Sequence, residues 1–204
     1  MLRVHLIRHA AFEGVGQRMV GRTPGVSLSA HGRAQARGLA DEFASRSIAA
    51  VYTSPLERAQ ETAAAIAAPH NVVPITSDAF AELDLGDWTG SELEDLHAHS
   101  AWRDFNTLRS LTRIPGGELM LETQTRAIAG LLDIQRHHVD ATVAIISHAD
   151  VIRAILGHLL GMPMDHLLRL EIAPASYSTI ELHGPWPQIH CIGNTSARLP
   201  DPGG

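Results

Sequence analysis

The amino-acid sequence predicts a three-layer α/β/α sandwich with a mainly parallel central sheet. Short apolar runs rich in β-branched residues alternate with longer amphipathic stretches, which is typical of strands and helices in an α/β sheet. The chain has 204 residues, enough to bury one core without a disulfide or a metal. We therefore expect a single domain over residues 1–198, with a helical insertion around 91–121 and a disordered tail at 199–204.

Strands are predicted where a short apolar run contains valine, isoleucine or other β-branched residues. In the first three quarters of the chain these runs cover residues 2–8, 48–53, 72–76 and 142–147. Further strands are predicted at residues 168–172, 177–182 and 189–192. Gly184 and Pro185, between the last two runs, indicate a hairpin turn.

Helices are predicted where apolar residues recur every three or four positions. These stretches open near residue 28 and cover residues 55–68, 123–138 and 150–160. Ser29 is the expected N-cap of the first helix, and Ser54 is the expected N-cap of the second, with Pro55 at its first position. Residues 91–113 have a helical pattern but follow no strand, so we expect them to cover one end of the sheet.

Composition excludes several classes of partner. The formal net charge is -6, which opposes a general nucleic-acid or membrane-surface binder. The N-terminus lacks the pattern of a signal peptide, and no run of about 18 apolar residues occurs, so we expect a cytoplasmic protein. Cys191 is the only cysteine, which fits a reducing compartment. Without a His-Glu-x-x-His motif or a cysteine pair, no metal site is expected.

Polar residues follow three of the predicted strands at the points where they end. Arg8 and His9 end the first strand, Arg58 lies in the helix after the second, and His148 follows the strand at 142–147. In an open α/β sheet the carboxyl ends of the strands line the binding crevice. We therefore expect two imidazoles and two guanidinium groups to meet at one edge of the sheet.

These residue types suit a phosphate group. Arginine presents a planar fork of donors that matches two phosphate oxygens, and the start of a helix adds free N–H groups. A neutral imidazole can act as a nucleophile near pH 7. A departing alcohol oxygen needs a proton from a nearby carboxylic acid, and Glu82 and Asp84 in the loop at 81–90 are both candidates.

At these residues the sequence resembles the histidine phosphatase superfamily, in its phosphoglycerate mutase-like branch. The resemblance runs from about Arg3 to Leu182 and follows the family's order of motifs. The matching segments are Leu6-Ile-Arg-His-Ala10, Leu28-Ser-Ala-His-Gly32, Thr53-Ser-Pro-Leu-Glu-Arg-Ala-Gln-Glu-Thr62, Glu82-Leu-Asp-Leu-Gly-Asp-Trp-Thr-Gly90, Pro115-Gly-Gly-Glu118 and Ser147-His-Ala149.

The resemblance implies a phosphoglycerate mutase-like fold and a role for each matched site residue. His9 would be the nucleophile and Glu82 the general acid, and then the base for water. The residues that would hold the phosphoryl oxygens are Arg8, Arg58 and His148. The resemblance implies that neither a metal ion nor another cofactor is needed.

The sequence also departs from the family pattern. Ala10 and Ala149 replace the glycines usual after each histidine, a modest change unless the backbone needs a positive φ. The usual polar residues after the first histidine are absent, because the chain reads Ala11-Phe-Glu-Gly-Val15. Arg22 and Thr23 are candidate substrate-binding residues in this part of the chain.

We expect a phosphatase that hydrolyses a small phosphorylated metabolite through a phosphohistidine. The alternatives are a phosphoglycerate mutase, a phosphohistidine-protein phosphatase, or a catalytically weak module that binds a phosphorylated ligand. A mutase must retain a bisphosphorylated intermediate, whereas this chain is acidic and contains no lysine, which favours the phosphatase. No nucleic-acid or membrane partner is expected, and a homodimer is a candidate assembly.

Overall fold

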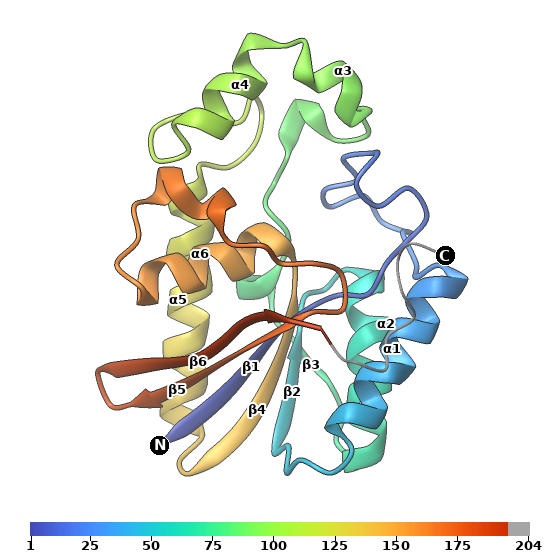
Figure 1. Ribbon diagram of the computed structural model, residues 1–204, viewed down its shortest axis with the longest axis vertical. Coiled ribbons are helices and arrows are strands. Elements are labelled where there is room, and N and C mark those ends of the chain that lie inside the picture. The colour runs from blue at the N-terminus through green and yellow to red at the C-terminus, as the bar shows by residue number, and fades with distance from the viewer. Residues whose placement is uncertain (196–204) are drawn as a thin grey trace.

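The computed structural model describes residues 1–195, in which six strands form one sheet (Figure 1). The strand order is β3-β2-β4-β1-β5-β6. The strands are β1 (Leu2–Arg8), β2 (Ala50–Thr53), β3 (Ile75–Thr76), β4 (Ala141–Ser147), β5 (Tyr177–His183) and β6 (Trp186–Asn194). Neighbours among β1 to β4 pair in parallel, while β5 is antiparallel to both β1 and β6. The predicted tail at 199–204 lies outside the described residues.

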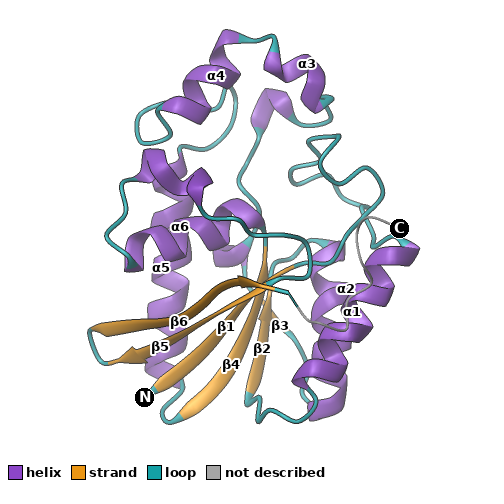
Figure 2. Cartoon of the chain, viewed as in Figure 1, coloured by secondary structure: helices purple, strands orange, loops and turns teal. Residues whose placement is uncertain are grey.

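Helices cover both faces of the sheet (Figure 2). One face carries α1 (Ala30–Phe43) and α2 (Glu57–Ala67), and the other carries α5 (Met120–His137) and α6 (Ala149–Leu159). The predicted insertion contains α3 (Leu93–His97) and α4 (Ser100–Thr107), which lie beyond the carboxyl ends of the strands. Short 3-10 turns occupy Asp78–Phe80, Gly86–Trp88 and Met164–Arg169, and Ala68–His70 extends α2. The structure confirms the predicted α/β fold class.

Side chains of β1 alternate between the two helical layers because successive residues of a strand point to opposite faces. Leu2, Val4 and Leu6 are buried in the core beneath α5 and α6, whereas Ile7 packs on the side of α1 and α2. None of the described helices is both long and apolar enough to cross a membrane.

The second helix starts later than predicted. Ser54 is not its N-cap, and α2 begins at Glu57 after an extended Leu56. The Ser54 hydroxyl lies 2.7 Å from Nε2 of His148, on the neighbouring strand end. Its oxygen also lies 3.3 Å from the Leu56 amide, so it stabilises a turn before the helix. The local N-cap signal was therefore overridden by a tertiary contact.

The strand predicted at residues 168–172 is wrong. A 3-10 turn ends at Arg169, and the next residues follow an irregular path. Their carbonyls bind arginine side chains in place of a neighbouring strand. The Leu170 carbonyl accepts a hydrogen bond from Nε of Arg153 at 2.9 Å, and the Ile172 carbonyl accepts one from Nη1 of Arg8 at 2.7 Å.

The first turn of α1 presses against the chain that follows β1. Ser29 is the N-cap of α1, as predicted, and its hydroxyl accepts a hydrogen bond from the Gly32 amide at 2.9 Å. A Cβ on Gly32 would lie 1.8 Å from the Ala11 carbonyl oxygen, a distance that no side chain tolerates. Glycine at this position therefore lets the helix support the residues next to His9.

We expect Gly32→Ala to lower the free energy of unfolding by about 1–3 kcal/mol, because the Ala11 backbone would have to move. Urea unfolding monitored by circular dichroism measures the change. His31→Ala, at an exposed position in the same turn, serves as the control and should change stability by less than about 0.5 kcal/mol. Equal stability of the Gly32→Ala variant and the wild type would contradict the packing argument.

Candidate active site

A cavity of about 170 Å³ lies at the carboxyl edge of the sheet. Arg8 and His9 reach it from the end of β1, Arg58 from α2, and Glu82 from the loop after the turn at Asp78–Phe80. His148, at the end of β4, lies directly behind His9, and their ring centroids are 5.0 Å apart. The structure thus brings together residues from four separate segments of the chain.

The His9 ring is held in one orientation and one tautomer. Its Nδ1 lies 2.8 Å from the Ala10 carbonyl oxygen, which can only accept, so Nδ1 carries the proton. The neutral ring therefore presents its Nε2 lone pair to the cavity side, 3.3 Å from Nε of Arg58. Burial, followed by the charges of Arg58 and Arg8, holds the pKa of His9 well below its usual range. The ring is therefore uncharged at neutral pH, with a proton on Nδ1 and a lone pair on Nε2.

Two arginines, the buried Arg58 and the half-buried Arg8, line the cavity beside His9. Arg58 is 1% exposed, and its Nη2 donates to the Gly21 carbonyl at 2.8 Å while its guanidinium lies over the Phe12 ring. Its Nη1 is buried without a hydrogen-bond partner among residues 1–195, and so is Nε of Arg8. Buried donors are rarely left unpaired in proteins. The two free N–H groups and the lining of the cavity fit the oxygens of an anion such as phosphate.

His148 is fully buried between the ends of β2 and β4. Its Nδ1 lies 3.4 Å from Nη2 of Arg58, which can only donate, so the ring proton belongs on Nε2 and points to Ser54. Burial first, and then the neighbouring His9 and Arg58, hold the pKa of His148 well below its usual range. Oε2 of Glu82 lies 3.5 Å from the same Nδ1.

Of the two acids that the sequence left open, Glu82 lines the cavity and Asp84 does not. Burial, and next the negative charge of Asp150, raise the pKa of Glu82, although Arg58 acts in the opposite direction. A carboxyl group with a raised pKa keeps its proton nearer neutral pH and can deliver it. Asp84 instead accepts a hydrogen bond from the Gly86 amide at 3.0 Å and is 42% exposed.

Comparison with known proteins agrees with this arrangement. The model of the histidine phosphatase superfamily, branch 1, matches residues 4–195. The chain belongs to this superfamily. It is 30% identical over 187 residues to "Phosphoserine phosphatase 1" of Hydrogenobacter thermophilus, covering 89% of this chain and 87% of that protein. It is also 30% identical to "Probable phosphoglycerate mutase GpmB" of an Enterobacter species, covering 91% of this chain and 88% of the relative.

Solved structures of the superfamily share the fold. YhfR of Bacillus stearothermophilus superposes with a TM-score of 0.90 at 27% identity, over 98% of this chain and all of that one. A mycobacterial glucosyl-3-phosphoglycerate phosphatase superposes with a TM-score of 0.84 at 24% identity, over 95% of this chain and 99% of that one. At this identity the second match supports the fold alone.

The two alanines that replace family glycines fit their positions. Among the described non-glycine residues, positive φ occurs at Asn71, Asp140 and Ala175, and neither Ala10 nor Ala149 is among them. Ala10 is buried, and its amide donates to the Thr62 hydroxyl at 3.1 Å. The replacements therefore introduce no left-handed backbone strain beside either histidine of this superfamily member.

Arg22 and Thr23 do not line the cavity. Nε of Arg22 donates to the Glu82 carbonyl at 2.7 Å, and its Nη2 lies 3.0 Å from Oε2 of Glu118. The Thr23 amide donates to the Val20 carbonyl. The structure therefore places Arg22 against the loop that carries the acid, and contact of either residue with a substrate stays a prediction.

Two ion pairs of Asp150 beside the cavity were not predicted from the sequence. Asp150, which lines the cavity, lies 3.1 Å from Nη1 of Arg109 and 3.1 Å from Nη1 of Arg153. Arg109 is 3% exposed and follows α4, so this contact joins the insertion to the first turn of α6. Asp150 stands two residues after His148, which was a usable signal, but nothing local marks Arg109 as its partner.

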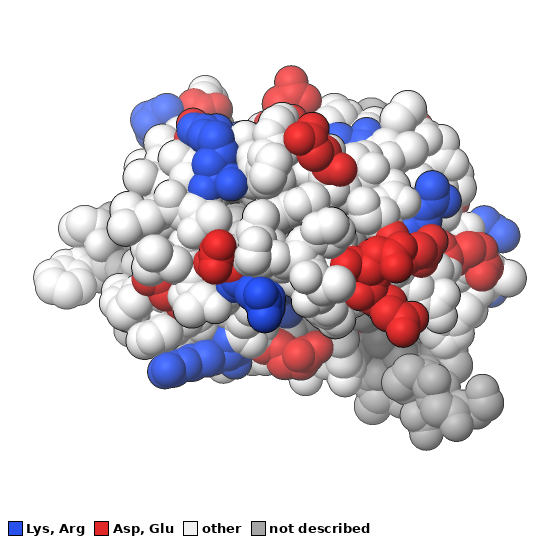
Figure 3. All heavy atoms as spheres, turned by 90° about the horizontal axis from the view of Figure 1, so that it is seen from above, with Lys and Arg blue, Asp and Glu red and all other residues white. Residues whose placement is uncertain are grey.

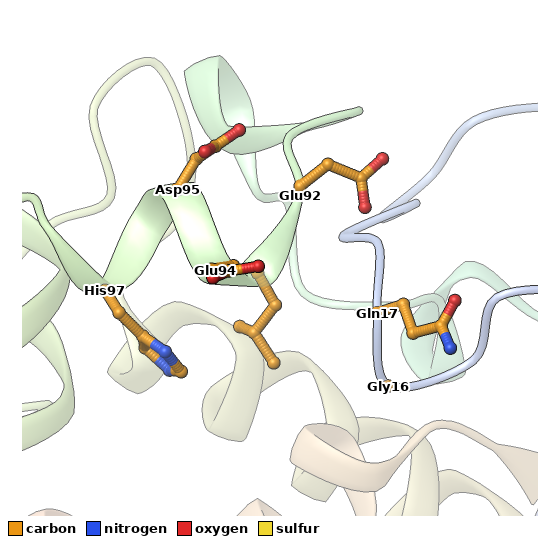
Figure 4. Close-up of a pocket in the computed structure, with 7 residues that line it drawn as sticks. Gly16, Gln17, Glu92, Glu94, Asp95 and His97 are labelled. Carbon is orange, nitrogen blue, oxygen red and sulfur yellow. The ribbon is translucent and has the colours of Figure 1, made fainter.

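A second, wider cavity of about 520 Å³ adjoins the first and shares Gly16 with it. Figure 4 shows Glu92, just before α3, pointing toward the loop that carries Gly16, with Glu94 and Asp95 on α3 itself. Viewed from the side of the insertion, acidic side chains gather mainly in one part of the surface (Figure 3). Within residues 1–195, no group of three or more His, Cys, Asp or Glu side chains could hold a metal ion.

We expect orthophosphate to bind in the first cavity and Arg58→Met to weaken its binding about ten- to hundredfold. A charged hydrogen bond to the anion contributes on the order of 1.5–3 kcal/mol. Isothermal titration calorimetry with phosphate measures the affinity. Arg37→Met, at an exposed position of α1, is the matched control and should bind phosphate like the wild type. Unchanged affinity in Arg58→Met would place the anion elsewhere.

We also expect the protein to lose stability as the pH falls below about 6.5. Burial, then the charges of Arg46 and Arg3, lower the pKa of His5 to about 4. Its Nδ1 lies 2.9 Å from the Thr179 hydroxyl in the core. The imidazole of the unfolded chain takes up a proton near pH 6.5, whereas the folded one does so only near pH 4, so acid favours the unfolded chain. At pH 4 the titration of His5 alone has lowered the free energy of unfolding by about 3 kcal/mol. The lowered pKa values of His9 and His148 act in the same direction.

Urea unfolding at pH 7 and pH 5 measures this dependence. The His5→Asn variant should lose less stability between the two pH values than the wild type, because one proton fewer is taken up on unfolding. Identical pH dependence in the variant and the wild type would show that His5 titrates normally in the folded protein.

Proposed function

We propose that this histidine phosphatase superfamily member hydrolyses a small-molecule phosphate monoester through a phosphohistidine on His9. The observation that carries the proposal is the orientation of His9. Its Nδ1 proton is held by the Ala10 carbonyl, so that Nε2 faces Arg58 in a cavity that Arg8 also lines. That geometry supports in-line attack on a phosphorus atom bound by Arg8 and Arg58.

In the first step, Nε2 of His9 forms a bond to phosphorus while the bond from phosphorus to the ester oxygen breaks. The carboxyl group of Glu82 gives its proton to the departing oxygen, which leaves as an alcohol. Arg8 and Arg58 stabilise the charge on the phosphoryl oxygens, and His148 adds a donor once its Nδ1 takes up a proton, which the negative charge of the bound phosphate favours. Arg58 must turn its Nε–H from His9 to a phosphoryl oxygen when the substrate enters, which frees the lone pair for attack.

In the second step, the Glu82 carboxylate takes a proton from a water molecule as the water oxygen bonds to phosphorus. The bond between phosphorus and Nε2 breaks, and its electron pair returns to His9. Orthophosphate leaves, and both side chains recover their starting protonation states. All the groups that move protons in this cycle belong to the chain itself.

The size of the cavity supports a small substrate. At about 170 Å³ it accommodates a phosphate group and a few further atoms, and the adjoining cavity of about 520 Å³ brings the available space into the range of about 300–1,000 Å³ that is usual for small-molecule ligands. Apolar walls from Phe12, Val15 and Leu85 face the charged residues across this space. We therefore propose a small phosphorylated metabolite as the substrate class.

A phosphoglycerate mutase is the second candidate, because a relative at 30% identity carries that name. Arg18 and Arg153 also line the cavity and could face a second phosphate. Arg153, however, is engaged by Asp150 and by the Leu170 carbonyl, which favours the phosphatase. Conversion of 3-phosphoglycerate to 2-phosphoglycerate, primed by the bisphosphate, would identify a mutase.

We expect the wild type to hydrolyse aryl and alkyl phosphates in the presence of excess chelator and His9→Ala to show only the uncatalysed rate. Glu82→Gln should lower kcat/KM for an alkyl phosphate about 10²- to 10⁴-fold, since it cannot supply a proton. Phosphate release measures turnover. With a substrate that carries a radioactive phosphorus label, acid-labile label that stays on the protein after rapid quenching identifies the phosphohistidine.

His31→Ala, at the exposed position used above, is the control and should retain full activity. If wild type and His9→Ala were equally inert across a panel of phosphate esters, a module that only binds phosphorylated ligands would replace the proposal.

A further inference from the structure

The loop that carries Glu82 is joined to the loop before α5 by reciprocal hydrogen bonds. The Glu118 amide donates to the Asp84 carbonyl at 3.0 Å, and the Asp84 amide donates to Oε2 of Glu118 at 3.0 Å. The Asp87 amide donates to the Pro115 carbonyl at 2.9 Å. Two segments about 30 residues apart therefore form one structural unit beside the cavity.

Glycines allow these backbones to approach so closely. A Cβ on Gly86 would lie 2.2 Å from the Pro115 carbonyl oxygen, and a Cβ on Gly117 would lie 2.4 Å from the Asp84 carbonyl oxygen. Either distance is far below van der Waals contact, so both positions require glycine. The Pro115-Gly-Gly-Glu118 segment thus has a structural explanation, and it delivers the Glu118 side chain to the acid loop.

Glu118 holds two arginines at once. Nε of Arg126 donates to its Oε1 at 3.1 Å, while Nη2 of Arg126 and Nη2 of Arg22 lie 3.1 and 3.0 Å from its Oε2. The Thr123 hydroxyl adds a hydrogen bond at 2.8 Å. Burial alone would raise the pKa of Glu118, but Arg126, the Asp84 amide and the Thr123 hydroxyl lower it to about 2. Glu118 is therefore ionised at neutral pH.

Both arginines bind the same atom of the proposed proton donor. Nε of Arg22 donates to the Glu82 carbonyl at 2.7 Å, and Nη2 of Arg126 donates to it at 3.1 Å. Arg22 comes from the chain after β1 and Arg126 from α5, so they reach this carbonyl from two separate segments. Glu118 binds both guanidinium groups, through Nη2 of Arg22 and through Nε and Nη2 of Arg126, which closes a ring of contacts around the Glu82 backbone.

We propose that Glu118 is a positioning residue that acts through Arg22 and Arg126 to hold the Glu82 carboxyl at the departing oxygen. The inference rests on the proposed function, because it assumes that Glu82 is the proton donor. Glu118 itself does not line the cavity. Its effect should therefore appear only in steps that use the Glu82 carboxyl, whereas a general loss of structure would affect every step.

The chemistry of the leaving group separates these two outcomes. An alkyl oxygen must be protonated as it departs, but a dinitrophenolate is stable without a proton. The ratio kcat/KM reports steps up to phosphorylation of the enzyme, before Glu82 is needed as a base for water. Comparing kcat/KM for an alkyl phosphate and for dinitrophenyl phosphate therefore isolates proton donation.

We expect Glu118→Gln to lower kcat/KM for the alkyl phosphate about 10- to 100-fold, because the Glu82 carboxyl would no longer be held at the departing oxygen. For dinitrophenyl phosphate, kcat/KM should fall by less than about threefold. Introduced into the Glu82→Gln variant, Glu118→Gln should cause no further loss with the alkyl phosphate, because it acts through Glu82. Glu122→Gln is the matched control: Glu122 binds Arg113 and the Leu119 amide at the same helix start, and its replacement should leave the ratio of the two substrates unchanged.

Equal losses with both substrates, no loss with either, or an additive loss in the double variant would each overturn the inference while leaving the phosphatase proposal standing. If His9→Ala and wild type hydrolysed neither substrate, the proposed function would fail and this inference with it. Should Glu118→Gln not fold, Arg126→Leu provides the same test. It removes one of the two contacts to the Glu82 carbonyl and must show the same dependence on the leaving group.

Discussion

The site depends on the burial of positive charge around an uncharged nitrogen. Arg58 is almost fully buried and is held by the Gly21 carbonyl and by two imidazoles, and no carboxylate of residues 1–195 forms a salt bridge with it. Burying a guanidinium without an opposite charge is costly. The same desolvation keeps His9 and His148 neutral and leaves donors free for an anion. The packing of the sheet beneath the site offsets the free-energy cost of this arrangement.

The phosphate-binding residues and the proton donor of the proposed reaction are held in place in two different ways. The phosphate cradle stands on the ends of parallel strands, where the register of β1 and β4 pairs Arg8 with Ser147 and so sets His9 beside His148. The acid comes from a loop, which lacks such a register. Its position depends on glycine-mediated contact with the loop before α5 and on the charges around Glu118. A rigid cradle and a separately held proton donor fit a reaction in which the acid must later act as a base.

Elements with strong local patterns could be predicted from the sequence. β1 agrees with the predicted residues 2–8 in full, and Ser29 caps α1 as expected, because alternation and capping are properties of neighbouring residues. The meeting of Arg8, His9, Arg58 and His148 followed from one general rule, that the carboxyl ends of parallel strands share an edge. Predicting that these residues meet required no knowledge of their side-chain partners.

The sequence alone therefore determined the fold class, the positions of the main strands and helices, and the residues aimed at the sheet edge. The tertiary structure alone decided that Ser54 serves His148 rather than capping a helix, that Glu82 faces the cavity while Asp84 does not, and that Arg22 braces the acid loop. The physical reason is range. Each of these outcomes depends on a hydrogen bond or contact to a residue far away in the chain, which no local pattern encodes.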